Sequence, residues 1–565
     1  MKVLLTAINS KYIHSNLAVY CLKAYAKKYM DNIEIMEFTI NNQTDYILCE
    51  MYKEKPDVIA ISCYIWNIGI VKEVTKELNK LMPDVPIWLG GPEVSYESEK
   101  TLNDMPWIKG IMCGEGEATF NEIMEYYFEK NNTLNRINGI VFRDDNGEII
   151  RTRYREPMNL DDVPFPYEHM EDFKNKIVYY ESSRGCPFRC SYCLSSIDKT
   201  VRFRSFEKVK KELQFFLDNK VPQVKFVDRT FNCKKNYAMD IWRYIMEHDN
   251  GITNFHFEIA ADLLDEDEIE LMHHMRPGLI QLEIGVQSTN IDTIKEIDRV
   301  MDFDHLSEIV KQINNTKNVH QHLDLIAGLP YETYDIFKKS FNDVYALRPE
   351  QFQLGFLKVL KGSKMYMNAK EYGVVYKSTP PYEVMYTKWL TFDEVISLKN
   401  VTEMVEVYYN SGQFSNTMEY LTKCYDTAFD MYDALSAYYV KNDLFSMKHS
   451  RITRYTILNE FIMENVNEED RQVLNEILIF DLYLRENMKT RPKFAGEVKD
   501  YMEILKALNI DKNRGKMVHA EKFSYDIEKT VKQKQPVKYE NYVIFDYERR
   551  NPLNYEAYYT VAPLH

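Results

Sequence analysis

Two successive series of short apolar runs, each alternating with helical stretches, constrain the fold of this chain more than any other feature. The first series has five runs, Val3–Ile8, Ile33–Ile40, Val58–Tyr64, Ile87–Gly90 and Ile108–Cys113. Amphipathic stretches such as Leu17–Tyr29 and Ile70–Leu81 separate them. Strands that alternate with helices form parallel sheets. We therefore expect an α/β fold whose first domain, residues 1–155, is doubly wound and Rossmann-like. It ends in a hairpin around Asn146-Gly147.

A second series begins after a proline-punctuated linker, residues 156–177. Its six runs are Val178–Ser183, Gln223–Asp228, Asn254–Ala261, Leu279–Val286, His320–Ile326 and Gln351–Leu357. This series predicts a parallel barrel of the TIM type, complete or partial, over residues 178–385. Residues 386–565 form a third, mostly helical domain in this interpretation. Its expected helices are Thr391–Tyr409, Met418–Tyr439, Ile452–Asn465 and Glu469–Glu486, followed by a closing hairpin of Tyr542–Tyr547 and Ala557–Val561.

Charge and cysteine usage narrow the class of protein. The formal net charge is −15 and the pI is about 5.5, which argues against a broad nucleic-acid surface. The N-terminus lacks a signal-peptide pattern, and no stretch approaches the ~18 apolar residues of a membrane span. Apart from one tight trio, the nine cysteines are thinly spread, as in a reducing compartment. We expect a cytoplasmic monomer with no membrane partner.

The cysteine trio lies in Arg184-Gly-Cys-Pro-Phe-Arg-Cys-Ser-Tyr-Cys193, directly after a predicted strand. Three thiolates, Cys186, Cys190 and Cys193, can hold three irons of a four-iron cluster and leave the fourth iron open to another ligand. Zinc is the main alternative, but a structural zinc site usually has four ligands in paired Cys-x2-Cys motifs. The spacing favours the iron–sulfur cluster.

This loop resembles that of the radical S-adenosylmethionine (SAM) superfamily, including the aromatic Tyr192 before the last cysteine. The resemblance implies that SAM binds the open iron, that its cleavage gives a 5′-deoxyadenosyl radical, and that Tyr192 lies against the adenine. Three later strands also resemble the family, in Lys225–Asn232, Leu282–Ser288 and Asp324–Thr333. The cofactor-binding residues implied there are Asp228, Glu283, Gln287, Ser288, Asp324 and Gly328.

Alternation along the barrel strands adds a prediction of its own. One face of each strand is polar, with His256 and Glu258, Gln281 and Glu283, His320, His322 and Asp324, and Gln351 and Gln353. The other face is apolar, as at Phe257 and Leu325. Parallel strands covered by helices usually have two apolar faces, so a polar face indicates a ligand-lined lumen. The alternative is that these groups bond only to one another.

Three glycine-containing motifs follow strands of the first domain: Ile61–Asn67, Leu89–Ser95 and Cys113–Thr119. Open α/β sheets bind ligands at the carboxyl ends of their strands. The first strand lacks the Gly-x-Gly-x-x-Gly fingerprint, which disfavours nicotinamide and flavin cofactors. The motifs resemble the cobalamin-binding domain of one branch of the superfamily, and imply binding by Ser62, Tyr64, Trp66, Gly90, Gly91, Pro92, Gly114 and Glu115.

The Asp-x-His-x-x-Gly motif that would supply a histidine to cobalt is absent from the sequence. The resemblance then implies that the loop Tyr64–Asn67 faces the lower side of cobalt. We expect His14 to be a loop or interface residue.

Together these features predict a cobalamin-dependent radical SAM enzyme with three cofactors, a 4Fe-4S cluster, SAM and cobalamin. The expected reaction is methyl transfer from methylcobalamin to an unactivated carbon of a small-molecule substrate that the sequence does not identify. An electron donor such as flavodoxin or ferredoxin is the expected partner. A non-methylating cyclase or rearrangement enzyme is the second hypothesis, and a sensor protein that carries cluster and cobalamin is the third, from another class.

Substituting Cys186, Cys190 or Cys193 by Ala should remove most of the cluster and all SAM cleavage, because three thiolates are the minimum that hold the cluster with one iron free. Iron content should be about four per chain for the parent protein after anaerobic reconstitution. Cys49→Ala, at a cysteine far from the trio in sequence, is the control. Cleavage that survives any one trio substitution would show that the ligands are misassigned.

Overall fold

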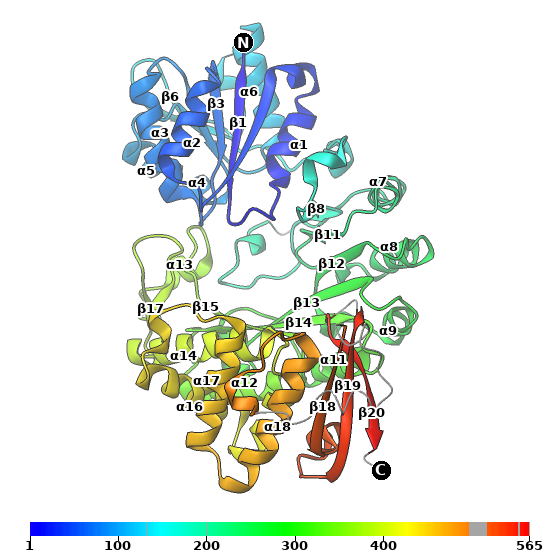
Figure 1. Cartoon of the computed structure of the whole chain (residues 1–565). Helices are drawn as coiled ribbons and strands as arrows, with labels where there is room; N and C mark the ends of the chain where they lie inside the picture. Colours follow the sequence, from blue (N-terminus) through cyan, green and yellow to red (C-terminus); the bar gives the residue numbers. More distant parts are fainter. Residues whose placement is uncertain (131–132, 199, 497–516, 552–553, 564–565) are drawn as a thin grey trace. The chain divides into compact units, whose positions relative to one another are not determined.

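The computed structural model describes residues 1–130, 133–198, 200–496, 517–551 and 554–563 (Figure 1). The chain divides into two compact units. The first contains residues 1–321, 328–332 and 356–390, and the second contains residues 322–327, 333–355 and 391–565. None of the helices in the described ranges is long and apolar enough to cross a membrane.

The first domain of the first unit is built on a seven-stranded sheet with the order β2-β1-β3-β4-β5-β6-β7. The first five strands in this order run parallel to one another. β6 is antiparallel to β5, and β7 is antiparallel to β6. The expected hairpin is therefore present. The strands are β1 (Val3–Asn9), β2 (Ile33–Thr39), β3 (Val58–Ser62), β4 (Ile87–Gly90), β5 (Gly110–Met112), β6 (Ile140–Arg143) and β7 (Ile149–Arg151).

Helices cover both faces of this sheet. On one face, α2 (Thr44–Lys53), α3 (Ile68–Leu81) and α5 (Ser98–Asp104) share a buried core with Leu4 and Ile59. On the other, α1 (Leu17–Tyr25) and α6 (Glu117–Glu129) pack on Val3 and Ala60. Burial on both sides explains why the strands read as continuous apolar runs. The short α4 (Pro92–Ser95) follows β4. The doubly wound prediction is confirmed.

The second domain of this unit holds four parallel strands in the order β8-β11-β12-β13. A two-residue antiparallel pair, β9 with β10, brackets the cysteine loop. The strands are β8 (Val178–Tyr180), β9 (Ser183–Arg184), β10 (Arg202–Phe203), β11 (Gln223–Phe226), β12 (Asn254–Ile259), β13 (Ile280–Gln287), β16 (Val375–Tyr376) and β17 (Val384–Tyr386). The helices are α7 (Phe206–Asp218), α8 (Lys235–Glu247), α9 (Glu266–His273), α10 (Ile291–Glu296), α11 (Phe303–Asn314) and α13 (Lys364–Asn368).

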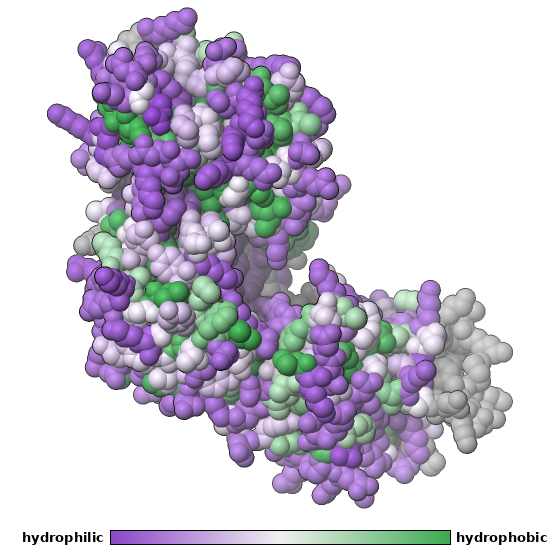
Figure 2. All heavy atoms as spheres, turned by 90° about the vertical axis from the view of Figure 1, so that its left-hand side faces the viewer, coloured by the Kyte–Doolittle hydropathy of each residue, from purple (hydrophilic) through white to green (hydrophobic). Residues whose placement is uncertain are grey.

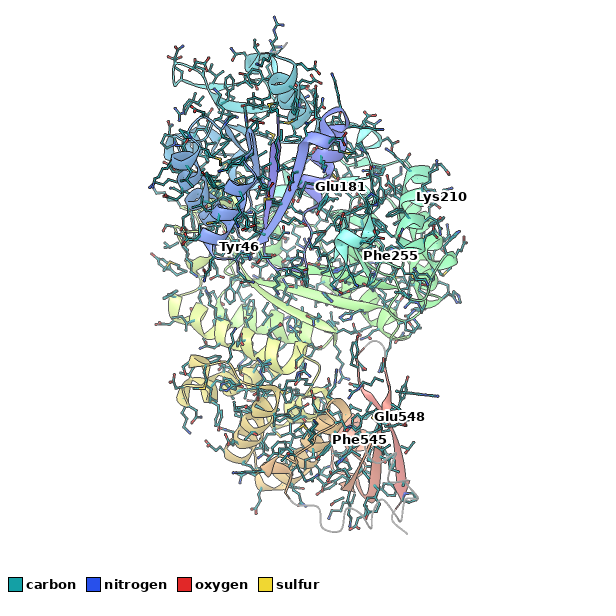
Figure 3. All side chains as sticks on the ribbon, turned by 45° about the horizontal axis from the view of Figure 1, so that its top comes forward. Tyr46, Glu181, Lys210, Phe255, Phe545 and Glu548 are labelled. Carbon is teal, nitrogen blue, oxygen red and sulfur yellow. The ribbon has the colours of Figure 1, made fainter. Side chains whose placement is uncertain are left out.

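The barrel strands alternate between an apolar outer face and a polar inner face. Phe257 has no exposed surface and its ring contacts those of Phe226, Phe231 and Trp242, the last on α8. Phe255, labelled in Figure 3, is also fully buried. In between, the polar side chains face the lumen, and the register pairs Lys225 with His256 and Glu258 with Glu283.

The second unit is mostly helical, as predicted. Its helices are α12 (Tyr334–Tyr345), α14 (Phe392–Val405), α15 (Ser415–Leu421), α16 (Ala428–Lys441), α17 (Arg451–Asn465), α18 (Glu468–Arg485) and α20 (Ile527–Gln533). It also holds most of β14 (His320–Ala327) and β15 (Gln351–Phe356). On β14, Leu323 and Leu325 are fully buried and Asp324 lies on the half-buried face.

Two details of this unit differ from the prediction. The single helix expected over Met418–Tyr439 is wrong, because a new helix starts at Ala428, where the Thr427 side chain caps it by accepting from Asp430 N. The expected terminal hairpin is present as β19 (Lys538–Arg550) and β20 (Ala557–Pro563). It belongs to a three-stranded antiparallel sheet with β18 (Val518–Tyr525), a strand that was not predicted from the sequence.

Phe257→Ala should lower the free energy of unfolding by about 3–5 kcal/mol, because it leaves a cavity among three aromatic rings. The measurement is the shift of the urea midpoint followed by tryptophan fluorescence, since Trp242 touches the site. Tyr154→Ala, at a side chain that is 77% exposed, should cost no more than about 0.5 kcal/mol. Equal shifts for the two variants would contradict the assignment of Phe257 to the core.

Candidate functional site

One cavity of about 700 Å³ joins the two domains of the first unit. Its first wall is made by the carboxyl ends of β1, β3, β4 and β5 and by the loops that follow them. Its second wall is made by residues of β8, β11 and β12, among them Tyr179, Lys225 and Glu258, and by Arg229 in the loop after β11. Ligand sites on open α/β sheets and on barrels both collect at these strand ends. The three cysteines of the trio are not among the residues that line this cavity.

The first wall brings together seven of the eight residues predicted to bind cobalamin: Ser62, Tyr64, Trp66, Gly90, Gly91, Gly114 and Glu115. Two glycines are needed by the backbone. Gly91 has φ +111° and a Cβ there would lie 2.5 Å from the carbonyl oxygen of Cys63; Gly114 has φ +80° and open space beside it. Backbone of this kind lets a large ligand approach closely. Pro92, the eighth residue, begins α4 and is not among the residues that line the cavity.

The loop after β3 presents a flat aromatic surface to the same cavity. The rings of Tyr64 and Trp66 stack at 4.4 Å with an interplanar angle of 5°, and Trp66 Nε1 donates to the carbonyl oxygen of Ile8 at 3.0 Å. Neither side chain is a good cobalt ligand. These residues therefore fit the face of a planar macrocycle that has no protein ligand on that side.

His14 also lines the cavity, at the junction of the two domains. Its Nδ1 is 2.6 Å from the hydroxyl of Tyr179, and its backbone forms a bridge with Ile177. Burial and the charges of Lys11 and Lys225 lower its pKa. His14 is thus an interface residue, as expected, and is neutral near pH 7.

The cysteine loop runs between β9 and β10. Gly185 has φ +100° at its start, where a Cβ would lie 2.2 Å from the carbonyl oxygen of Thr200. Cys186 and Cys190 are buried, and Cys193 is partly exposed. Among the described residues, no three His, Cys, Asp or Glu side chains already surround one point. The donor set of three thiols on one short loop fits a cluster with one open iron.

A half-buried ion cluster ties this loop to the first domain. Arg184, two residues before Cys186, contacts Glu117 at 2.6 Å and Glu181 at 2.8 Å. Its neighbour across the β9–β10 pair, Arg202, binds Glu115. Burial opposes ionisation of Glu117, but the charge of Arg184 outweighs it and lowers the pKa of Glu117. Figure 3 labels Glu181 where the two domains meet.

Arg299 is a site residue that was not predicted from the sequence. Its guanidinium lies 3.7 Å from Cys190 Sγ and 3.5 Å from the Tyr192 hydroxyl, and it donates to the carbonyl oxygen of Gly285. Its Nε is buried and has no hydrogen-bond partner. None of the ion pairs of the described part of the chain involves Arg299. A partly buried cation without a carboxylate is costly, so this geometry fits an anionic group of a ligand beside the cysteines.

The lumen carries a connected polar network. Glu283 accepts from Lys225 Nζ at 2.8 Å and lies 3.1 Å from His256 Nε2. Burial alone would raise the pKa of Glu283, but His256 and Lys225 together lower it to about 2. Burial raises the pKa of Glu258 to about 7, although Arg229 lies 3.8 Å away. Glu258 can therefore exchange a proton near neutral pH within the cavity.

The other predicted SAM-binding residues lie in different settings. Asp228 is fully buried and accepts from Ser182 N, Ser182 Oγ and Ser183 Oγ at 2.9, 2.6 and 2.6 Å. It positions the strand end that leads into the cysteine loop. Ser288 donates to Glu332 at 2.6 Å. The remaining members are Gln287, buried with φ +72°, Gly328, with φ +90°, and Asp324, on a strand segment of the second unit.

Two domain families match the two walls of the cavity. Residues 3–124 match the B12 binding domain, and residues 180–344 match the radical SAM superfamily. The chain therefore contains a B12 binding domain and a radical SAM domain, and its cofactors are cobalamin, SAM and a 4Fe-4S cluster, as predicted. Residues 370–545 match a third family, described as a protein of unknown function (DUF4080).

Two relatives and one solved structure show what this chain is similar to. The cobalamin-dependent radical SAM methyltransferase TokK of Streptomyces tokunonensis is 25% identical over 312 residues, 50% of this chain and 44% of TokK. An anaerobic magnesium-protoporphyrin IX monomethyl ester cyclase of Synechocystis sp. is 30% identical over 239 residues, 40% of this chain and 47% of the cyclase. The chain thus spans less than half the length of both relatives.

The solved structure is that of the cobalamin-dependent S-adenosylmethionine radical enzyme OxsB with aqua-cobalamin bound. Its TM-score is 0.58 at 16% identity, and the match covers 94% of this chain and 83% of OxsB. The likeness establishes a shared fold.

Arg184→Met should destabilise the protein by about 3–5 kcal/mol, because the buried Glu117 and the half-buried Glu181 then lose their ion-pair partner. In a double-mutant cycle with Glu117→Gln, the two losses should differ from additivity by more than about 1 kcal/mol. Urea unfolding of the cobalamin-free protein measures both. The exposed pair Lys53 and Glu50, changed to Met and Gln, should show coupling below about 0.5 kcal/mol. Additive losses at Arg184 and Glu117 would contradict the proposed ion cluster.

Proposed function

We propose that this enzyme transfers a methyl group from cobalamin to a carbon atom of a small-molecule substrate, working in the cytoplasm with a reduced electron-carrier protein. One observation carries the proposal: the glycine loops of the B12 binding domain and the polar inner strands of the radical SAM domain line the same cavity of about 700 Å³. A substrate held there would contact the glycine loops on one side and, on the other, the barrel strands together with Arg184, which lies two residues before Cys186. The similarity to TokK, a cobalamin-dependent radical SAM methyltransferase, supports the choice of reaction.

In this proposal each wall holds its own cofactor. Cys186, Cys190 and Cys193 hold the cluster, and Tyr192 and the Gln287–Ser288 strand end border SAM. The Arg299 guanidinium, which lacks a carboxylate partner among the described residues, binds the SAM carboxylate. Gly90, Gly91, Gly114 and the stacked Tyr64 and Trp66 hold cobalamin. When bound, the cluster and SAM supply a 5′-deoxyadenosyl radical, and cobalamin supplies the methyl group.

The chain itself positions the substrate and keeps water out. Lys225 and His256 both contact the Glu283 carboxylate, at 2.8 and 3.1 Å. The three side chains therefore offer a polar surface that is in place before substrate binds. Glu258, with a pKa of about 7, can hold or release a proton at its carboxylate during turnover. Asp228 fixes the strand end that leads into the cysteine loop.

The second candidate is a reaction without methyl transfer, in which the substrate radical closes a ring or rearranges. The 30% identity to a magnesium-protoporphyrin IX monomethyl ester cyclase favours such an enzyme over a sensor protein. The cavity residues do not separate the two reactions. The two reactions differ in the fate of the methyl group, which reaches the product only in methyl transfer.

The test uses the holoenzyme, SAM with a deuterated methyl group, and a small-molecule extract of the source cells. We expect 5′-deoxyadenosine together with a new small molecule that carries the labelled methyl group, and neither with Cys193→Ala. Deoxyadenosine with an unlabelled product would favour the cyclase-type reaction. Absence of both products, with all three cofactors bound, would favour a sensor and overturn the proposal.

A further inference from the structure

We propose that residues 356–390 form the docking surface for a small acidic electron-carrier protein that reduces the cluster. One electron passes from the reduced carrier to the oxidised cluster, and the carrier is oxidised by one electron. The proposal rests on the proposed function, because only a redox-active cluster needs such a partner. The first observation is charge. The segment has six lysines and two glutamates, a net charge of +4, in a chain whose net charge is −15.

An acidic carrier is repelled by most of this molecule, so a local cationic surface decides where it can bind. Five of the six lysines are exposed: Lys358, Lys364, Lys370, Lys377 and Lys388. Lys364 pairs with Asp298 at 2.6 Å and Lys377 with Glu383 at 3.4 Å. Within the described part of the chain, Lys370 and Lys388 form no ion pair. They are available to a partner, and the exposed Glu371 is the only acid of the segment left beside them.

The segment lies directly against the cysteine loop. Met365 N donates to the carbonyl oxygen of Ser191, which lies between Cys190 and Cys193. Met365 is fully buried on the inner side of α13, whereas Met367 is 70% exposed on its outer side. A helix is roughly 10–12 Å across with its side chains. A carrier seated on the outer side is therefore about one helix width from the cluster loop.

The outer side of α13 is also hollowed. A shallow depression of about 600 Å³ is lined by α13 and the chain that follows it, including Met367, Lys370, Val374 and Val375. Lys388 lies at its edge, since a Cβ on Gly373 would be 2.9 Å from Lys388 Cγ. Figure 2 looks onto the side of the molecule where α13 and β17 lie in Figure 1, and green apolar atoms there lie among purple hydrophilic ones. An apolar floor with a cationic rim suits an acidic protein partner.

The experiment compares two reductants on the same reconstituted protein. The rate at which reduced flavodoxin reduces the 4Fe-4S cluster is followed by stopped-flow absorbance and checked by electron paramagnetic resonance. Lys370→Glu with Lys388→Glu should slow this reaction roughly 10-fold or more at low ionic strength and weaken its salt dependence. Reduction by dithionite, a small inorganic reductant that needs no docking surface, should change less than about twofold.

The matched control is Lys72→Glu with Lys76→Glu, two exposed lysines on α3 that change the net charge by the same amount. This control should leave the flavodoxin rate within about twofold of the parent. An unchanged flavodoxin rate in the Lys370/Lys388 variant, or an equal loss in the control, overturns the docking surface. Loss of both reductions in the Lys370/Lys388 variant also overturns it, because the cluster loop itself would then be disturbed. Failure of the proposed methyl transfer is seen separately, since cluster reduction needs no substrate.

Discussion

The arrangement of the two proposed cofactor sites depends on one guanidinium that is only 20% exposed, that of Arg184. It lies two residues before the first cysteine of the cluster loop and binds Glu117, the first residue of α6 in the B12 binding domain, at 2.6 Å. Charges removed from water destabilise the fold unless opposite charges lie close to them. The Arg184–Glu117 ion pair therefore fixes the cysteine loop against α6 of the first domain. A reaction that uses both cofactors on one carbon requires such fixed spacing. The loop proposed to bind cobalamin and the loop proposed to bind the cluster are therefore joined by the ion pairs of Arg184 and Arg202.

The second constraint is the alternation of polar and apolar residues on the barrel strands. The aromatic residues on the outer face, such as Phe257, supply the burial that holds the helices. The inner face is thereby free to carry the Glu283 carboxylate, which lies against the Lys225 ammonium and the His256 imidazole. Both interpretations of the polar face, a ligand-lined lumen and a set of mutually bonded groups, are thus partly right. The groups bond to one another, and they also border a cavity, because Lys225 and Glu258 line it. The contacts of Lys225 and His256 with the Glu283 carboxylate lower the cost of burying that charge.

Features that depend on local pattern could be predicted from the sequence, and features that depend on long-range packing could not. The cysteine spacing, the strand alternation and the glycine motifs can each be recognised from a short stretch of the sequence. Arg299 carries no such signal, since its role arises only where the chain after α10 returns to Cys190 and Tyr192. Asp228 illustrates the opposite case: the motif was visible, but only the fold shows that Ser182 and Ser183 occupy its carboxylate. In the second unit, β18 was missed because the alternation that marks a strand is weak there, with Ala520 and Glu521 both buried.

The segment 356–390 shows why the part of the chain after the barrel strands belongs to the site. It supports both cofactor loops at once: Lys361 binds Glu93 at 2.8 Å directly after the Gly90-Gly91-Pro92 turn, and Met365 N binds Ser191 O in the cysteine loop. Tyr366 adds a hydrogen bond to Glu97 at 2.8 Å. The third domain family begins at residue 370, inside this segment. A partner that binds the outer face of this segment would therefore contact the same segment that holds both the cysteine loop and the loop after β4. Binding of the electron carrier and the geometry of the cavity would then depend on the same few contacts.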